Sequence, residues 1–250
     1  MLVLLGAMRE EIADLQRQMI IEETYTEQGY GIYKGKYGNK DVLLAQTGIG
    51  KEKAERTAKY ILEHYPITAL ICLGFAGALA KGLEIGDVIL STTLHCEDNQ
   101  TPGKLELQSP FCSDINLFSI ASQTQEDIGS VFYQASIVTV LNPICEPKAK
   151  LALGKAFSAK AADMESYWIA GIASARCIPF LNIRVISDTV EHRLLPFDRF
   201  LDSGSWRWRR VALYFLIHPQ QLVGLFFLYR NARRARKSLT NFMDSFISRL

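Results

Sequence analysis

Ala161-Ala-Asp-Met-Glu-Ser166 and Ile183-Arg-Val-Ile-Ser-Asp188 are the two stretches that decide the fold. The first predicts the start of a helix that carries two carboxylates at its positive end. The second is an apolar strand whose last residues are polar. Ligands of open α/β sheets bind beyond the carboxyl ends of strands. These two segments therefore predict a site for one small polar ligand, although helix capping by Asp163 and Asp188 is the simpler alternative for each residue alone.

Apolar runs with strand-like and helix-like spacing alternate along most of the chain. Such alternation predicts a mostly parallel sheet covered by helices on both faces, which is an α/β fold. The length suits one domain with a full core. We expect residues 1–192 to form the catalytic domain and residues 193–250 a basic helical extension of it. The expected strands are 2–5, 42–45, 67–73, 136–141 and 180–186, residues 83–90 are expected to hold a turn and a strand, and the expected helices include 51–64, 113–127, 146–157 and 164–175.

The cysteines and histidines indicate neither a disulfide framework nor a metal site. The five cysteines are scattered and odd in number, and the four histidines stand alone. We therefore expect no metal, reduced thiols and a cytoplasmic protein. The apolar run at residues 1–6 is too short for a signal peptide, and no run approaches the ~20 apolar residues that span a bilayer.

Glycine follows two other predicted strands, at Thr47-Gly-Ile-Gly50 and at Gly74-Phe-Ala-Gly77. The first lacks the Ser or Thr of a phosphate loop, since Glu52 follows Lys51. The second lacks the Gly-x-Gly-x-x-Gly pattern of dinucleotide sites. Both are expected to be tight turns, and both would let the backbone approach a ligand closely.

These strand ends, together with Gly6-Ala-Met-Arg-Glu-Glu11 and Asp163-Met-Glu165, resemble the nucleoside phosphorylase/nucleosidase superfamily in their order and spacing. The likeness runs from residue 2 to about residue 190 and is greatest to methylthioadenosine/S-adenosylhomocysteine nucleosidases. It implies a three-layer α/β/α sandwich with a mixed, partly barrel-like central sheet. It also implies a homo-oligomer, with a dimer favoured, and an enzyme that needs no cofactor. Phosphate is the alternative co-substrate to water.

The resemblance gives three carboxylates catalytic roles in cleaving an N-glycosidic bond. Asp188 would protonate N7 of the base, Glu165 would bind the ribose hydroxyls, and Glu11 would activate the attacking water. General acids of this kind need a pKa raised toward neutrality by burial. The substrate-binding residues implied by the resemblance are Gly6, Ala7, Ile49, Gly74, Phe75, Ala76, Gly77, Asp163, Met164, Arg184 and Ser187.

Three departures from the nucleosidase pattern leave alternatives open. Phe75 stands where that family has a hydroxyl residue, Asp163 replaces Glu, and residues 140–146 lack the adenine-stacking Phe. The alternatives are a phosphorylase and a nucleoside-binding protein without turnover; an oxidoreductase is a more distant one. Asp-Met-Glu-Ser and the long basic tail are more similar to the hopanoid-associated branch, which removes adenine from adenosylhopane.

The C-terminal segment is strongly basic. Residues 193–250 hold 11 Lys and Arg against 3 Asp and Glu, a net charge of +8. One helical face is apolar, with Leu225, Leu228, Ala232, Ala235, Leu239, Phe242, Phe246 and Leu250, and the opposite face carries Arg230, Arg233, Arg234 and Lys237. Such a helix suits an anionic membrane surface, or it packs on the protein's own core or on a dimer mate. No recognition motif indicates nucleic acid.

Overall fold

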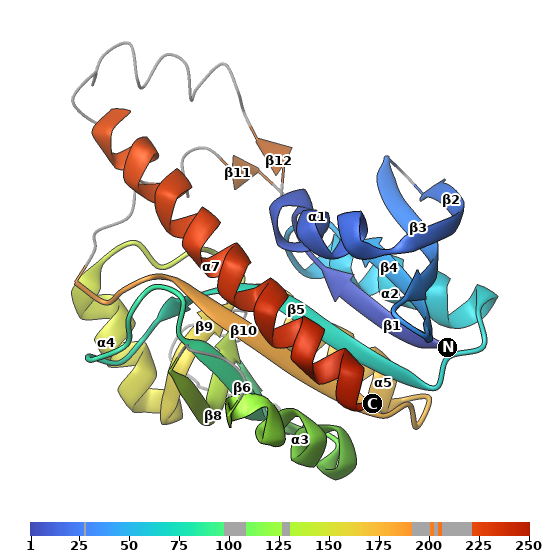
Figure 1. Ribbon diagram of the computed structural model, residues 1–250. Helices are drawn as coiled ribbons and strands as arrows, with labels where there is room; N and C mark the ends of the chain where they lie inside the picture. Colours follow the sequence, from blue (N-terminus) through green and yellow to red (C-terminus); the bar gives the residue numbers. More distant parts are fainter. Residues whose placement is uncertain (28, 98–108, 127–130, 192–200, 203–204, 207–221) are drawn as a thin grey trace.

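The computed structural model describes residues 1–27, 29–97, 109–126, 131–191, 201–202, 205–206 and 222–250. Strands and helices alternate through most of them, as the sequence predicts (Figure 1). The strands are β1 (Leu2–Gly6), β2 (Ile20–Glu27), β3 (Tyr30–Tyr37), β4 (Lys40–Gln46), β5 (Ala69–Ala78), β6 (Val88–Cys96), β7 (Phe111–Cys112), β8 (Phe132–Thr139), β9 (Ala159–Asp163), β10 (Phe180–Asp188), β11 (Leu201–Asp202) and β12 (Ser205–Trp206). The helices are α1 (Arg9–Gln18), α2 (Lys51–His64), α3 (Ile115–Ser122), the 3₁₀ turn η1 (Gln123–Glu126), α4 (Pro147–Phe157), α5 (Ser166–Ser174) and α7 (Leu222–Arg249).

Five strands close into a barrel-like ring, because β5 pairs with both β9 and β10. The ring continues from β10 through β6 and β8 to β9. Its β10–β5, β6–β8 and β8–β9 pairs are parallel, whereas β10–β6 and β5–β9 are antiparallel. Strands β1, β4, β3 and β2 extend the sheet outward from β5. The sheet is therefore mixed and partly barrel-like.

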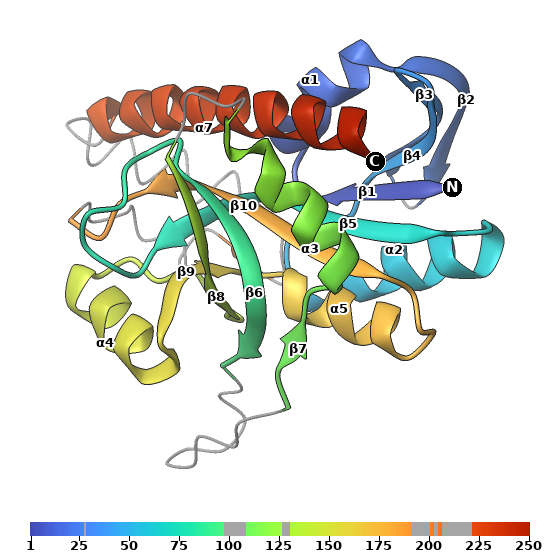
Figure 2. The same ribbon diagram turned by 60° about the horizontal axis from the view of Figure 1, so that its bottom comes forward.

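Helices cover both faces of this sheet (Figure 2). On one face α2 and α5 pack against each other over a core that includes Ala58, Ile61 and Ile169. On the other face α1, α3 and α7 enclose a second core around Ile12 and Phe242. The fold is the three-layer α/β/α sandwich that the resemblance implies.

The apolar stripe of α7 packs on the protein's own core. Ala235, Leu239, Phe242 and Phe246 are fully buried, and α7 contacts β10, β5 and α1. Leu250 is half-buried, whereas the basic residues of the opposite face are exposed. The side chain of Leu225 and residues 207–221 lie outside the described part of the chain. None of the described helices is long and apolar enough to cross a bilayer.

Two local predictions are wrong. Gly74–Gly77 is not a tight turn but lies inside β5, where Gly74 pairs with Arg184 and Gly77 with Asp188 of β10. Residues 161–163 do not open a helix but end β9, and α5 begins only at Ser166. In both places pairing with neighbouring strands determines the backbone, and a single-sequence pattern does not contain that pairing.

Candidate active site

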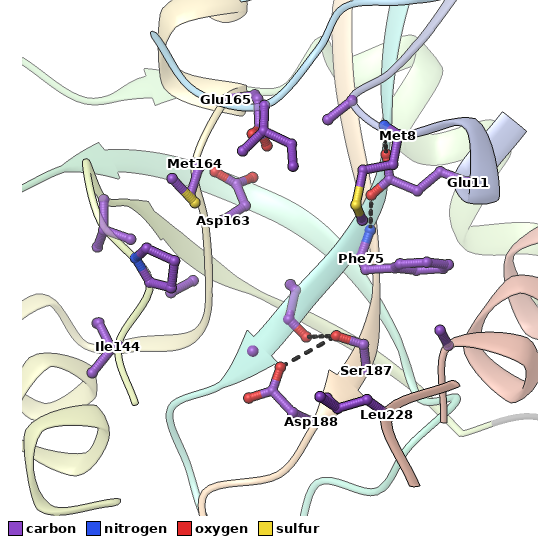
Figure 3. A pocket seen from close by; sticks show the side chains of 18 of the residues that line it. Met8, Glu11, Phe75, Ile144, Asp163, Met164, Glu165, Ser187, Asp188 and Leu228 are labelled. Atoms are coloured by element: carbon purple, nitrogen blue, oxygen red, sulfur yellow. Dashed lines mark hydrogen bonds between the residues drawn. The ribbon is translucent and has the colours of Figure 1, made fainter. Parts of the chain in front are cut away.

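A cavity of about 350 Å³ lies at the ends of β1, β5, β9 and β10. This volume is within the range of sites that bind small organic ligands. The predicted site residues that line it are Ala7, Glu11, Ile49, Phe75, Ala76, Gly77, Asp163, Met164, Glu165, Ser187 and Asp188. Gly6, Gly74 and Arg184 do not line it; the first two lie against Glu11, and Arg184 binds Asp163. Segments far apart in the sequence therefore meet at one cavity (Figure 3).

Glu11 is positioned by backbone amides. It is the third residue of α1, and its Oε2 accepts a hydrogen bond from the Met8 amide at 2.8 Å. Its Oε1 accepts one from the Phe75 amide of β5 at 2.8 Å. A Cβ at Gly74 would lie 2.5 Å from Oε1, so only glycine leaves room for this carboxylate. The close approach of the Glu11 carboxylate to the backbone of β5 therefore requires glycine at position 74.

Glu165 connects the start of α5 to the start of α2. Its Oε1 accepts a hydrogen bond from the Gly50 amide at 2.9 Å. Gly50 has φ +91°, a conformation that favours glycine and that aims this amide at the carboxylate. The side chain of Glu165 is buried, yet it borders the cavity beside Met164.

Arg184 is the counter-ion of the buried carboxylates near Glu165. It is 1% exposed, and its Nε donates to Asp163 Oδ2 at 2.8 Å. Its Nη2 lies 3.9 Å from Glu165 Oε2 and donates to Cys72 Sγ at 3.3 Å. Asp163 also accepts a hydrogen bond from Thr139 Oγ1 at 2.7 Å. One guanidinium therefore offsets the carboxylates that surround it.

Burial dominates the electrostatics of these carboxylates. Desolvation raises the pKa of Glu165 to about 7, against the opposing effects of Arg184 and the Gly50 amide. Desolvation also raises the pKa of Glu11, while Arg184 and backbone hydrogen bonds from Phe75 and Met8 partly offset it. A carboxyl group with a pKa near 7 can exchange a proton at neutral pH, which is the property that acid–base chemistry requires.

Asp188 lies at the opposite end of the cavity, at the end of β10 (Figure 3). Its Oδ1 accepts a hydrogen bond from Ser187 Oγ at 3.2 Å, and its Oδ2 forms an ion pair with Lys150 of α4. A Cβ at Gly77 would lie 3.1 Å from Oδ2, so the carboxylate rests against the backbone of β5. Apolar side chains that line the cavity include Val140 and Ile144.

The profile described as the phosphorylase superfamily matches residues 1–215. The chain belongs to this superfamily. A methylthioadenosine/S-adenosylhomocysteine nucleosidase of Tolumonas auensis is 31% identical over 194 residues, which cover 74% of this chain and 84% of that protein. A protein of the same name from Bacillus cereus is 30% identical over 216 residues, covering 82% and 93%.

Solved structures of two other proteins share the fold. The methylthioadenosine/S-adenosylhomocysteine nucleosidase of Neisseria meningitidis, in complex with methylthio-immucillin-A, aligns with a TM-score of 0.78 and 22% identity. The alignment covers 100% of this chain and 99% of that one. The futalosine hydrolase of Helicobacter pylori aligns with a TM-score of 0.74 at 22% identity, covering 100% and 97%.

Sequence reasoning missed three contributors to this superfamily site. Lys150 has ordinary helical surroundings in the sequence, and nothing there indicates that its ammonium reaches Asp188. Thr139 binds Asp163 only because β8 and β9 are neighbours. Leu228 of α7 lines the cavity, although the sequence gives it only a place in an apolar stripe. Among the described residues, no group of three His, Cys, Asp or Glu side chains is placed to hold a metal ion.

Proposed function

We propose that this protein hydrolyses the N-glycosidic bond of an adenine nucleoside and releases the free base. The observation that carries the proposal is the placement of Glu11, Glu165 and Asp188 around one cavity of about 350 Å³. Adenine is supported by the nucleosidase relatives at about 30% identity. The bond under attack would lie between the Glu11–Glu165 end and the Asp188 end.

The Glu11–Glu165 end suits the sugar. Breaking the bond makes the ribose positively charged, and buried carboxylates stabilise such charge strongly because little water screens them. Glu165 would accept hydrogen bonds from the ribose hydroxyls, and Met164 would pack against the ring. Glu11 would accept a proton from the attacking water.

The other end suits the base. Cleavage leaves negative charge on the departing purine, which a proton at N7 neutralises. Asp188, supported by Ser187, is the group we assign to this transfer. The apolar side chains of Val140 and Ile144 would hold the flat ring.

Water is the nucleophile that the charges favour over phosphate. In the part of the chain that the structure describes, Lys150 is the one cationic side chain that lines the cavity, and it lies with Asp188 rather than Glu11. A singly charged phosphate oxygen ~4 Å from Glu11 would cost roughly 4 kcal/mol at an effective dielectric near 20. Arg184 binds Asp163 and Cys72 and does not line the cavity.

A nucleoside panel tests this function. Purified protein is incubated with methylthioadenosine, S-adenosylhomocysteine and a lipid-linked adenosine such as adenosylhopane, with and without phosphate. We expect free adenine and a reducing sugar at rates that phosphate leaves unchanged. A sugar 1-phosphate product would identify a phosphorylase, and tight binding without base release would identify a binding protein.

We further propose that the protein is a cytoplasmic homodimer, as the resemblance implies. Light scattering after gel filtration tests the oligomeric state.

The first turns of α7 expose Phe227, Tyr229, Arg230 and Arg233, which supports docking of this segment on an anionic membrane. Co-sedimentation with phosphatidylglycerol vesicles, and its loss with phosphatidylcholine vesicles or in a Phe227→Ser/Tyr229→Ser variant, tests that docking. Such a location would suit a lipid-linked nucleoside.

A further inference from the structure

Lys150 is buried beside the carboxylate that faces the base. Its side chain is 2% exposed, and its Nζ donates hydrogen bonds to Asp188 Oδ2 and, at 3.0 Å, to the Thr189 carbonyl. It also lines the cavity. Among the described residues, Asp188 is the one charged group in contact with this ammonium.

Fold stability does not account for a lysine at this position. Replacing a buried ion pair with apolar side chains is often neutral or stabilising, because removing two charges from water is costly. Leu153 and Phe157 of the same helix pack in an apolar cluster with Val140, so α4 is held by apolar contacts that do not involve Lys150. Buried ion pairs that border a cavity are instead candidates for a role in chemistry.

We propose that Lys150 supplies the proton that Asp188 passes to the leaving base, an inference that rests on the nucleoside hydrolysis proposed above. An ion pair means that the resting proton is on the amine and that the carboxylate is ionised. As the C1′–N9 bond breaks, its electron pair goes to the base. Asp188 takes a proton from Lys150 Nζ and passes it to N7.

Protons and charges balance without another reactant. Lysine ends as a neutral amine, Asp188 remains a carboxylate, and the base leaves neutral with a proton on N7. Water adds to the ribose cation and gives its own proton to Glu11. Solvent returns that proton to the amine after the base departs.

This arrangement changes the pH range in which an acid is available. An ordinary lysine keeps its proton to about pH 10, whereas an ordinary aspartic acid loses it near pH 4. The other charged groups that border the cavity or lie beneath it are Glu10 and Glu11 of α1, Asp163 of β9, Glu165 at the start of α5, and Arg184 of β10. Burial raises the pKa of Glu11 and of Glu165, so we assign the acidic limb of the pH profile of kcat to these two carboxyl groups. The basic limb reflects the supply of a proton to the base.

Lys150→Arg separates proton supply from charge. Arginine keeps the positive charge beside Asp188 but does not release a proton in this range. We expect kcat for adenine release to fall at least ~100-fold, the usual contribution of general acid catalysis. Hydrolysis of 4-nitrophenyl riboside, whose leaving group needs no proton, should stay at the wild-type rate. Lys148→Arg, at an exposed position of the same helix, is the control and should match the wild type on both substrates.

Three other results of these assays would overturn the proposal. Wild-type activity of Lys150→Arg on adenine nucleosides overturns the lysine proposal and leaves the hydrolase intact. Loss of both substrates in this variant also overturns it, because the lysine would then support the fold or the sugar end. A wild-type protein that cleaves neither substrate overturns the proposed function as well.

Lys150→Met provides a second test that does not need a buried arginine. Asp188 must then take its proton from solvent, so the basic limb of the kcat profile for adenine release should move to lower pH, with 4-nitrophenyl riboside unaffected. Circular dichroism and the melting temperature of each variant establish folding. An unshifted basic limb in folded Lys150→Met contradicts the proposal.

Discussion

The two ends of the cavity hold their charges in different ways. At the sugar end, Glu11 and Glu165 accept hydrogen bonds from the backbone amides of Met8, Phe75 and Gly50, and share one buried arginine. At the base end, the contacts of Asp188 include the side chains of Ser187 and Lys150. Backbone amides cannot change their protonation, whereas a lysine can. The sugar end therefore fixes its carboxylates by backbone contacts, whereas the base end places a second titratable side chain beside its carboxylate.

Arg184→Met breaks the sugar end most severely. It leaves Asp163 and Glu165 buried without their guanidinium, and removing one partner of a buried ion pair costs about 3–5 kcal/mol. We expect the free energy of unfolding, measured in urea, to fall by this amount and base release to be lost.

Arg176→Met is the matched control for this change. Arg176 forms an ion pair with Glu63 at 3.2 Å on the surface, and exposed pairs contribute about 0–1 kcal/mol. If both variants lose equal stability, Arg184 does not hold the charge balance that the site requires.

A pair of glycine substitutions compares the two ends directly. In Gly74→Ala the new Cβ would lie 2.3 Å from Arg184 Nη1 and 2.5 Å from Glu11 Oε1, so these groups must move. In Gly77→Ala the nearest atom would be Asp188 Oδ2 at 3.1 Å, which needs only a small shift. A displacement of ~1 Å costs about 100-fold in rate.

We therefore expect Gly74→Ala to lose about 100-fold in kcat on every substrate, including 4-nitrophenyl riboside. Gly77→Ala should lose less, and only on purine nucleosides. Equal losses on both substrates in Gly77→Ala would mean that the two ends are not separate in function.

The fold could be predicted from the sequence where strands are buried on both faces of the sheet, because such strands are continuous apolar runs. The prediction was wrong at Gly74–Gly77 and at 161–163 because both segments are strands only through pairing with β10, β8 and β9. Small residues with weak periodicity give no local sign of such pairing. The α/β class was therefore accessible, whereas the resemblance rather than the pattern implied the closed ring.

At the site, the carboxylates could be predicted because they stand at strand and helix ends in a recognisable order. Lys150 could not, because a lysine in a helix is normally exposed and its contact with Asp188 spans 38 residues. The position of Arg184 beneath the cavity, rather than in its wall, also depends on tertiary packing. Sequence order therefore located the carboxylates of both ends, but not the contacts of Lys150 and Arg184.

Glu165→Gln sharpens the comparison through pH. The folded pKa of about 7 exceeds the ordinary value of 4.5, so between these pH values the folded state holds a proton that the unfolded state has lost. Wild-type stability from this group therefore falls as pH rises from 4.5 to 7 and stays low above 7. We expect Glu165→Gln to be inactive, yet more stable than the wild type at pH 8, with less difference at pH 5.

Urea titrations at the two pH values measure this effect. Glu63→Gln, which changes an exposed carboxylate, should leave the pH dependence of stability unaltered. A Glu165→Gln variant that is less stable than the wild type at pH 8 would show that the carboxylate is ionised and favourably paired when folded.

Leu228→Ala gives the smallest expected effect and tests whether α7 belongs to the site. Leu228 is half-buried and borders the cavity near Ser187 and Asp188 (Figure 3), whereas the neighbouring Phe227 is 48% exposed and does not line it. Loss of an apolar contact in a pocket costs about 1–3 kcal/mol of binding free energy, or roughly a 10- to 200-fold change. We expect the lower value for a half-buried side chain. We expect KM for methylthioadenosine to rise about 10-fold with kcat unchanged, since uniform binding is lost and the charges at either end are not moved. Phe227→Ala, the control, should leave KM unaltered. A fall in kcat for Leu228→Ala would instead mean that α7 positions Asp188. The helix would then act on the base end of the cavity and not only on the wall between the sugar end and the base end.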